Sequence, residues 1–61
     1  MTILRKYLLR KFTDSGNYDA KVGKQGEVEE YGADLDHAIK RAMEKYGGSK
    51  GHWMMIGVIS Q

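Results

Sequence analysis

The chain is built around one segment, Asp34-Leu-Asp-His-Ala-Ile-Lys-Arg-Ala-Met-Glu-Lys-Tyr46. Its apolar residues recur at the spacing that lines one side of an α-helix: Leu35, Ala38, Ile39, Ala42, Met43 and Tyr46. Asp34 is a favourable N-cap, and Gly47 is placed to end the helix in the left-handed conformation. The sequence therefore predicts one amphipathic helix, and the rest of the chain must supply the surface on which it packs.

Extended segments are expected before this helix. Residues 2–13 fit a helix or a strand, and we favour a strand because the Asp-Ser-Gly-Asn sequence at 14–17 is a turn signal. Apolar and polar residues then alternate over 18–22, as in the return strand of a hairpin. The glycines within 23–26 indicate either a bulge in one long strand or a turn between two short strands, the second covering 27–31.

The end of the chain predicts a third extended element. Residues 47–51 are a glycine-rich connector, and residues 52–60 carry no charge when the histidine is neutral, which predicts a well-buried strand. A right-handed crossover through the helix gives the sheet order second, first, last, with both neighbours antiparallel to the first strand. The expected fold is α+β, a single domain over residues 1–61. It is a small antiparallel sheet, ββαβ or βββαβ, with one helix on one face.

Length and composition exclude several classes of protein. A chain of 61 residues buries only about 60% of its unfolded surface. There is no cysteine for a disulfide, and the two histidines, His37 and His52, lie too far apart in sequence to indicate a metal site. There is no run of about 18 apolar residues and no segment typical of a signal peptide. We therefore expect a cytoplasmic protein with no membrane partner, no metal and no cofactor.

The predicted last strand is apolar on both faces. Regular alternation places one row of side chains on one face of the strand: Trp53, Met55, Gly57 and Ile59. It places a second row on the opposite face: Met54, Ile56 and Val58. One short helix covers only one sheet face. We therefore expect the row with Trp53, Met55 and Ile59 to form a partner-binding surface, since tryptophan and methionine suit interfaces. The alternative is that hairpin side chains or long basic side chains cover this row.

The first strand is basic and suggests a second kind of partner. Arg5, Lys6, Arg10 and Lys11 flank Tyr7, a combination that can bind phosphates and stack on bases. Alternation sends the two members of each basic pair to opposite faces, however, and basic residues on a strand are often a device against aggregation. No nucleophile and base occur at a recognisable spacing, so we expect no catalytic residues and no enzyme.

The segment from Tyr31 to Tyr46 is similar to the helix segment of a phage protein family, the small RNA polymerase inhibitors made early by lytic short-tailed coliphages. The resemblance rests on these residues: Tyr31, Leu35, Asp36, Ala38, Ala42 and Tyr46. It extends in outline to a preceding hairpin and a following strand. The family's last-strand arginines have no counterpart here, because Gly57 and Ile59 stand near those positions.

The resemblance implies a small intracellular inhibitor of the phage type, a class that also includes anti-CRISPR proteins. Such a protein acts in the host cytoplasm by occupying a surface of a host protein complex. Our first hypothesis is therefore a non-enzymatic binding protein. The alternative is a small nucleic-acid-binding module that uses the basic first strand, and a third hypothesis is a homodimer formed through the spare apolar row.

Overall fold

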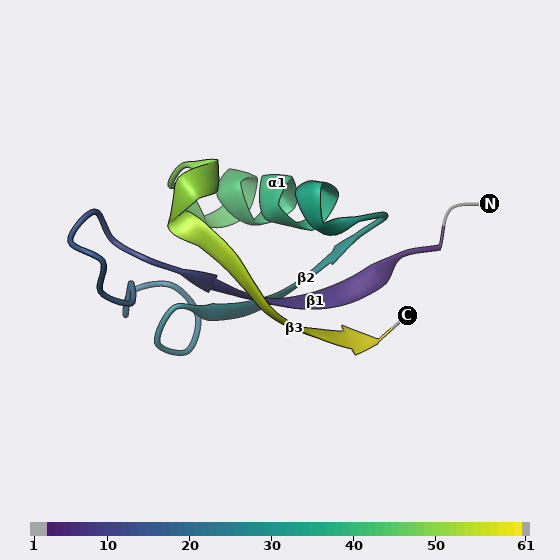
Figure 1. The fold of residues 1–61 in the computed structure, drawn as a ribbon, viewed down its shortest axis with the longest axis horizontal. Helices are drawn as coiled ribbons and strands as arrows, with labels where there is room; N and C mark the ends of the chain where they lie inside the picture. The colour runs from purple at the N-terminus through teal and green to yellow at the C-terminus, as the bar shows by residue number, and fades with distance from the viewer. Residues whose placement is uncertain (1–2, 61) are drawn as a thin grey trace.

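The computed structural model describes residues 3–60 and contains three strands and one α-helix (Figure 1). The elements in chain order are β1 (Arg5–Lys11), β2 (Glu27–Gly32), α1 (Leu35–Tyr46), one turn of 3-10 helix called η1 (Lys50–His52), and β3 (Trp53–Ser60). The strands form one antiparallel sheet in the order β2-β1-β3, and α1 lies on one face of it. The predicted α+β class, ββαβ order and central first strand are confirmed.

The chain between β1 and β2 differs from the prediction. Residues 18–26 form turns with only two isolated bridges, and the strand begins at Glu27. Gln25 and Gly26 have φ angles of 55° and 85°, which an extended strand does not accommodate. Val22 still reaches the hydrophobic core. A strand over the first part of this segment, whether one bulged strand or two short ones, was therefore a wrong prediction.

Both ends of α1 are capped as predicted. The Asp34 carboxylate accepts a hydrogen bond from the His37 main-chain N–H at 2.9 Å, which satisfies one of the free donors of the first turn. At the other end Gly47 has a φ of 87° and its N–H donates to the Met43 carbonyl oxygen at 2.8 Å. These contacts hold the helix to the length that its apolar pattern indicates.

The hydrophobic core lies between α1 and the sheet. It is formed by residues from every strand, the helix and the turn segment: Tyr7, Leu9, Val22, Val28, Ala38, Ile39, Ala42 and Trp53. The small residues of the helix let it approach the end of β2 closely. A Cβ atom on Gly32 would lie 2.4 Å from the Ala38 nitrogen, so only glycine fits there.

The helix is not centred over the sheet. It packs mainly against β2 and less against β1, and Lys45 of the helix contacts the buried carboxylate of Glu30 at 2.9 Å. Strand β3 starts beside the C-terminal end of α1 and then runs alongside β1 and away from the helix (Figure 1). The core face of β3 is therefore covered only at its beginning.

Two register shifts interrupt the pairing of β3 with β1. Met55 pairs with Leu9, and Gly57 pairs with the residue just before Leu9 in β1. Ile56 is therefore an extra residue on β3, and Ile59 is the extra residue of the second shift. Bulges of this kind bend a strand and increase its twist. They also change the regular alternation of side chains that the sequence alone suggests.

Candidate protein-binding surface

Strand β3 carries an uncovered apolar surface. Five of its eight residues are large hydrophobic residues whose exposed fractions lie between 38% and 55%. We call this set the β3 apolar surface: Met54, Met55, Ile56, Val58 and Ile59. A single exposed apolar side chain is ordinary, but a contiguous group on one strand is typical of an interaction site. The expectation that 52–60 forms a well-buried strand is thus wrong, because β3 is an edge strand that α1 does not cover.

The β3 apolar surface wraps around the strand and occupies both faces. Residues directly paired in an antiparallel sheet have their side chains on the same face. Met55 pairs with Leu9 and Val58 pairs with Tyr7, and both of these partners are buried in the core. Met55 and Val58 therefore continue the core face beyond the helix, whereas Met54 lies on the opposite face.

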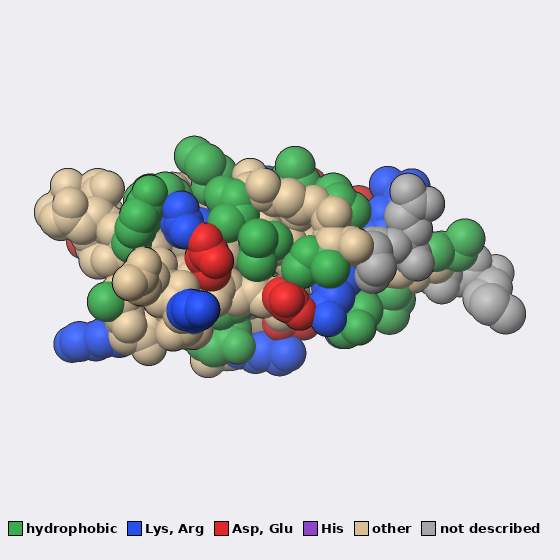
Figure 2. Space-filling view, turned by 90° about the horizontal axis from the view of Figure 1, so that it is seen from below, with side chains coloured by type: hydrophobic (Ala, Val, Ile, Leu, Met, Phe, Trp, Pro, Cys, Tyr) green, Lys and Arg blue, Asp and Glu red, His purple; other side chains and the backbone are tan. Residues whose placement is uncertain are grey.

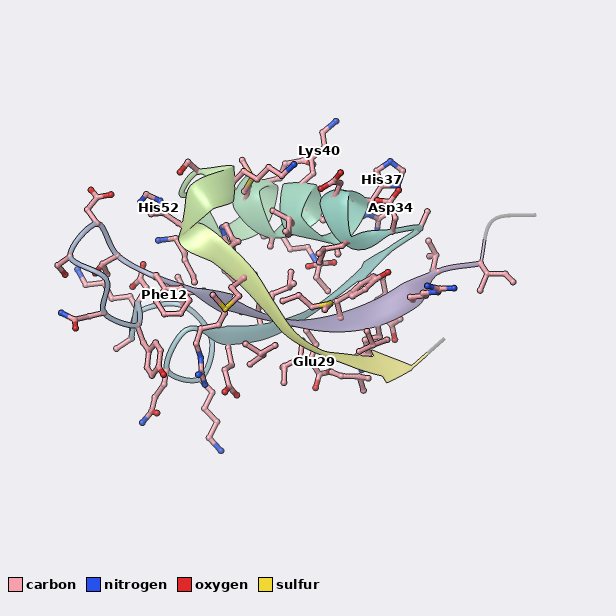
Figure 3. All side chains as sticks on the ribbon, in the orientation of Figure 1. Phe12, Glu29, Asp34, His37, Lys40 and His52 are labelled. Carbon is pink, nitrogen blue, oxygen red and sulfur yellow. The ribbon has the colours of Figure 1, made fainter. Side chains whose placement is uncertain are left out.

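Figure 2 shows the molecule from the side of the sheet that α1 leaves open, where hydrophobic side chains alternate with charged ones. Two ion pairs on this face join β1 to β2. Lys6 and Glu29 are 2.7 Å apart, and Arg10 contacts Glu27. In Figure 3 Glu29 is seen on the side of the sheet away from α1.

Trp53 is not an exposed anchor, contrary to the sequence-based expectation. Its side chain is 6% exposed, and its indole N–H donates to the Gly47 carbonyl oxygen at 3.1 Å. The Tyr46 ring packs beside it, with 6.1 Å between ring centroids. The physical reason is position, since β3 begins next to the end of α1 and only then leaves it. Met55 and Ile59 are exposed as expected, and their role in binding stays a prediction.

The basic residues of β1 are largely engaged within the chain. Lys11 is 8% exposed and its ammonium group lies 2.7 Å from the Asp19 carboxylate. Tyr7 is also buried, so neither residue is available to a partner. Arg10 lies over the Tyr18 ring, with 4.2 Å from its guanidinium carbon to the ring centroid. Arg5 is exposed. The predicted basic surface of Arg5, Lys6, Arg10 and Lys11 is therefore not continuous.

Two ionisable groups in these pairs have shifted pKa values. The hydrogen bond from Lys11 lowers the pKa of Asp19 below its ordinary value, against a smaller opposite effect of burial. The hydrogen bond to Glu29, together with the charge of that carboxylate, raises the pKa of Lys6. Both shifts favour the charged forms at neutral pH. The contacts with Lys11 and Glu29 therefore hold Asp19 and Lys6, respectively, in their charged forms.

One polar cluster was missed by sequence reasoning. The His52 ring joins Ser49 and Asp14, residues far apart in the chain: Nε2 lies 2.6 Å from the Asp14 carboxylate, and Nδ1 lies 3.3 Å from the Ser49 hydroxyl. The three residue types are those of a hydrolytic triad, but Nδ1 already accepts the Ser49 main-chain N–H at 3.2 Å. Asp14 is also almost fully exposed to water. We interpret the cluster as a cap on η1 tied to the turn after β1.

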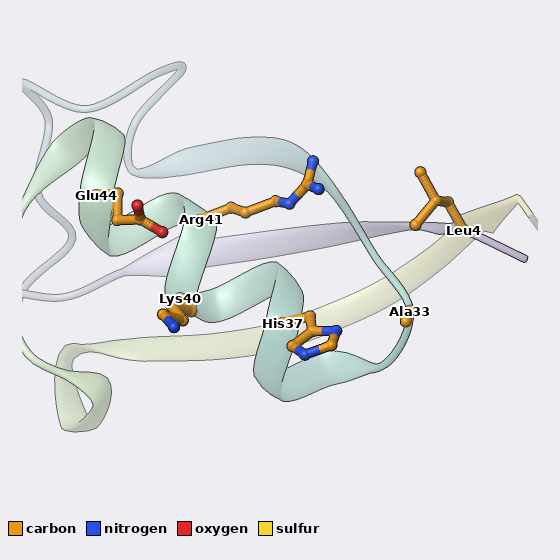
Figure 4. Close-up of a pocket in the computed structure, with 6 residues that line it drawn as sticks. All are labelled: Leu4, Ala33, His37, Lys40, Arg41 and Glu44. Carbon is orange, nitrogen blue, oxygen red and sulfur yellow. The ribbon is translucent and has the colours of Figure 1, made fainter. Parts of the chain in front are cut away.

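A shallow groove of about 380 Å³ lies on the helix side (Figure 4). Its lining residues come from the outer face of α1 and from the two chain segments beside it: Leu4, Ala33, His37, Lys40, Arg41 and Glu44. His37 and Lys40 point away from the sheet in Figure 3. The groove is open and mixed in charge, so it has no group isolated from water that could serve in catalysis.

Within residues 3–60 there is no cluster of three or more metal-ligating side chains. No α-helix in this part of the chain is long and apolar enough to cross a membrane. Comparisons with family models, with curated proteins and with solved structures each gave no match. The likeness of the helix segment to phage inhibitors therefore stays a prediction.

Proposed function

We propose that this chain is a small non-enzymatic binding domain that attaches to another protein through the β3 apolar surface. The observation that carries the proposal is the exposure of five large hydrophobic side chains on one strand of eight residues. Leaving such a group in water is unfavourable by roughly 25 cal/mol for each Å² of apolar area. A protein partner that covers these side chains gains that free energy on binding.

The chemistry of β3 favours a protein over a nucleic acid as the partner. Trp53–Ser60 contains no charged residue, whereas nucleic-acid binding depends on cations that meet phosphates. Three of the four basic residues of β1 are paired with carboxylates of this same chain, namely Lys6, Arg10 and Lys11. The two methionines of the surface are flexible and adapt to irregular partner surfaces.

The helix resemblance suggests the kind of protein that is bound. Small phage inhibitors occupy a surface of a host complex, and we infer that this chain acts in the same manner on a host protein or protein complex. Two partly exposed ion pairs lie beside the β3 apolar surface, Lys6–Glu29 and Arg10–Glu27. Their charges can orient a partner that has a charged rim. Affinity comes from the hydrophobic centre and orientation from this rim.

The experiment compares three tagged forms of the chain in affinity capture from a bacterial lysate, with each captured protein quantified. Met54→Lys places a charge at the most exposed position of the β3 apolar surface. Ala20→Lys adds the same charge at an exposed position in the turn segment and serves as the control. We expect one defined protein to be retained by the wild type and the control, and reduced by about tenfold or more in Met54→Lys.

Two results would contradict the proposal. One is equal capture of the same protein by the wild type and Met54→Lys, which would move the binding site away from β3. The other is capture that requires nucleic acid, shown by loss after nuclease treatment and by a steep decrease with added salt. Circular dichroism of each variant first establishes that the substitutions leave the fold in place.

A further inference from the structure

The distribution of charged residues among the strands is the reverse of the usual one, with charges in the central strand and none in one edge strand. Central strands are covered on both sides and usually carry few charges, whereas edge strands carry charges that prevent pairing with other chains. Here the central strand β1 contains Arg5, Lys6, Arg10 and Lys11. The edge strand β3 has no charged residue over its full length. By composition β3 is an interior strand, although it lies at an edge.

The second edge of the sheet shows the protection that β3 lacks. Strand β2 contains Glu27, Glu29 and Glu30, and the side chain of Glu29 is half exposed. A second copy of β2 placed beside it would bring the partly exposed carboxylates of Glu27 and Glu29 near their copies, and like charges facing each other on neighbouring strands are unfavourable. Charge repulsion therefore disfavours pairing of β2 with a strand of another chain, whereas β3 carries no charge that would oppose such pairing.

We propose that β3 pairs with β3 of a second copy of this chain, antiparallel and around a twofold axis. The two three-stranded sheets then form one continuous sheet in which the two β3 strands are central. A second copy fits this edge because a charge-free strand meets another charge-free strand, so no charge is buried without a partner. The acidic β2 strands then lie at the two far ends, where their mutual repulsion is smallest.

The proposed pairing also covers side chains that α1 leaves exposed. A twofold axis between antiparallel edge strands is perpendicular to the sheet, so both helices lie on the same face. Met55 and Val58, which are on the core face beyond α1, then meet the same residues of the second copy in the space between the two helices. A chain of 61 residues has a small core, and pairing adds to its buried apolar area.

The register shifts at Ile56 and Ile59 do not prevent this arrangement. They increase the twist of β3, and neighbouring strands of any sheet are normally twisted relative to one another. The proposal does not depend on the proposed function, because pairing uses the main chain along the edge of β3 and covers only the Met55 and Val58 part of the β3 apolar surface. Met54 stays on the sheet face opposite α1, so a dimer presents two copies of that part of the β3 apolar surface side by side.

Sedimentation of the purified chain from micromolar to near-millimolar concentration tests the proposal. We expect the mass to rise with concentration to twice that of the chain. Ile56→Lys places a charge near the middle of β3, where it lies close to its copy across the axis. We expect this variant to raise the dimer dissociation constant by about tenfold or more. Ala20→Lys, with the same added charge in the turn segment, should leave the constant unchanged.

Hydrogen exchange identifies the surface that is used. Amides of β3 that point away from β1 should exchange more slowly as the dimer forms, while the amides of β2 should not change. A chain that stays monomeric at the highest concentration overturns the proposal, as does a dimer in which β3 amides are not protected. Equal dimerisation of wild type and Ile56→Lys also overturns it. If Ile56→Lys does not fold, Val58→Lys, at a more exposed position, replaces it in every measurement.

Discussion

The indole N–H of Trp53 donates a hydrogen bond to the carbonyl oxygen of Gly47, at 3.1 Å. This bond joins the first residue of β3 to the residue that ends α1. Gly47 is needed there because its φ of 87° is one that other residues rarely adopt. The helix end and the strand start are therefore held together before β3 leaves the helix and becomes exposed.

Trp53→Ala is expected to destabilise the fold. It removes a side chain that is 6% exposed and leaves a cavity between α1 and the sheet, a change that typically costs about 3–5 kcal/mol in free energy of unfolding. Chemical denaturation followed by circular dichroism measures the loss. Trp53→Phe keeps most of the packing and removes the bond to Gly47, so it should cost less than the alanine variant. Wild-type stability in Trp53→Ala would show that this residue is not part of the core.

Gly32→Ala is expected to push β2 and α1 apart. The added Cβ would lie 2.4 Å from the Ala38 nitrogen and 2.8 Å from the Asp34 carbonyl oxygen, both main-chain atoms that cannot rotate away. Overpacking of this kind costs about 1–3 kcal/mol. Gly51→Ala, where the nearest atom to the added Cβ is 3.9 Å away, is the matched control. Thermal unfolding should show a clear decrease in Tm for the first variant and a much smaller change for the second.

The Lys11–Asp19 pair predicts a loss of stability in acid. The pKa of Asp19 is lowered in the folded protein, so the unfolded chain binds the proton first as the pH falls. The stabilising contribution is therefore fully present above the ordinary value of 3.8 and is lost as the pH falls through the lower folded value. Asp19→Asn removes this contribution at every pH.

The measurement for this prediction is the free energy of unfolding of wild type and Asp19→Asn at a series of pH values. The difference between the two proteins should be constant around neutral pH and should decrease below 3.8. Asp36→Asn is the control, since Asp36 is a largely exposed partner of Lys50. If the difference between wild type and Asp19→Asn does not depend on pH, Asp19 is not held in its charged form by Lys11.

Much of the fold follows from local signals in the sequence. The helix was predicted with its caps because apolar spacing, Asp34 and Gly47 act over a few residues. The sheet order followed from the handedness of the crossover. The segment 18–22 was mistaken for a strand because alternating apolar residues also occur in turns, and Gln25 takes a positive φ that composition does not reveal.

The β3 apolar surface was only partly predictable, because it depends on how the elements are placed together. One helix covers only one of the two faces of a sheet. The sequence alone therefore indicates that one strand keeps apolar residues exposed to water. Which side chains those are depends on the register shift at Ile56 and on where α1 lies, and neither has a local signal. The pairing of His52 with Asp14 joins residues that are 38 positions apart and was missed on the same ground.

The amino-acid sequence by itself determined the helix with its caps, the order of the main elements and the absence of charge from the last strand, because these depend on neighbouring residues and on simple rules of chain connection. Only the tertiary structure decided that Trp53 is buried and that Met54, Met55, Ile56, Val58 and Ile59 are exposed. The physical reason is that α1 packs over β2, where Gly32 allows close approach, and so leaves β3 uncovered. Exposure is a property of how elements are placed together, and no single segment encodes it.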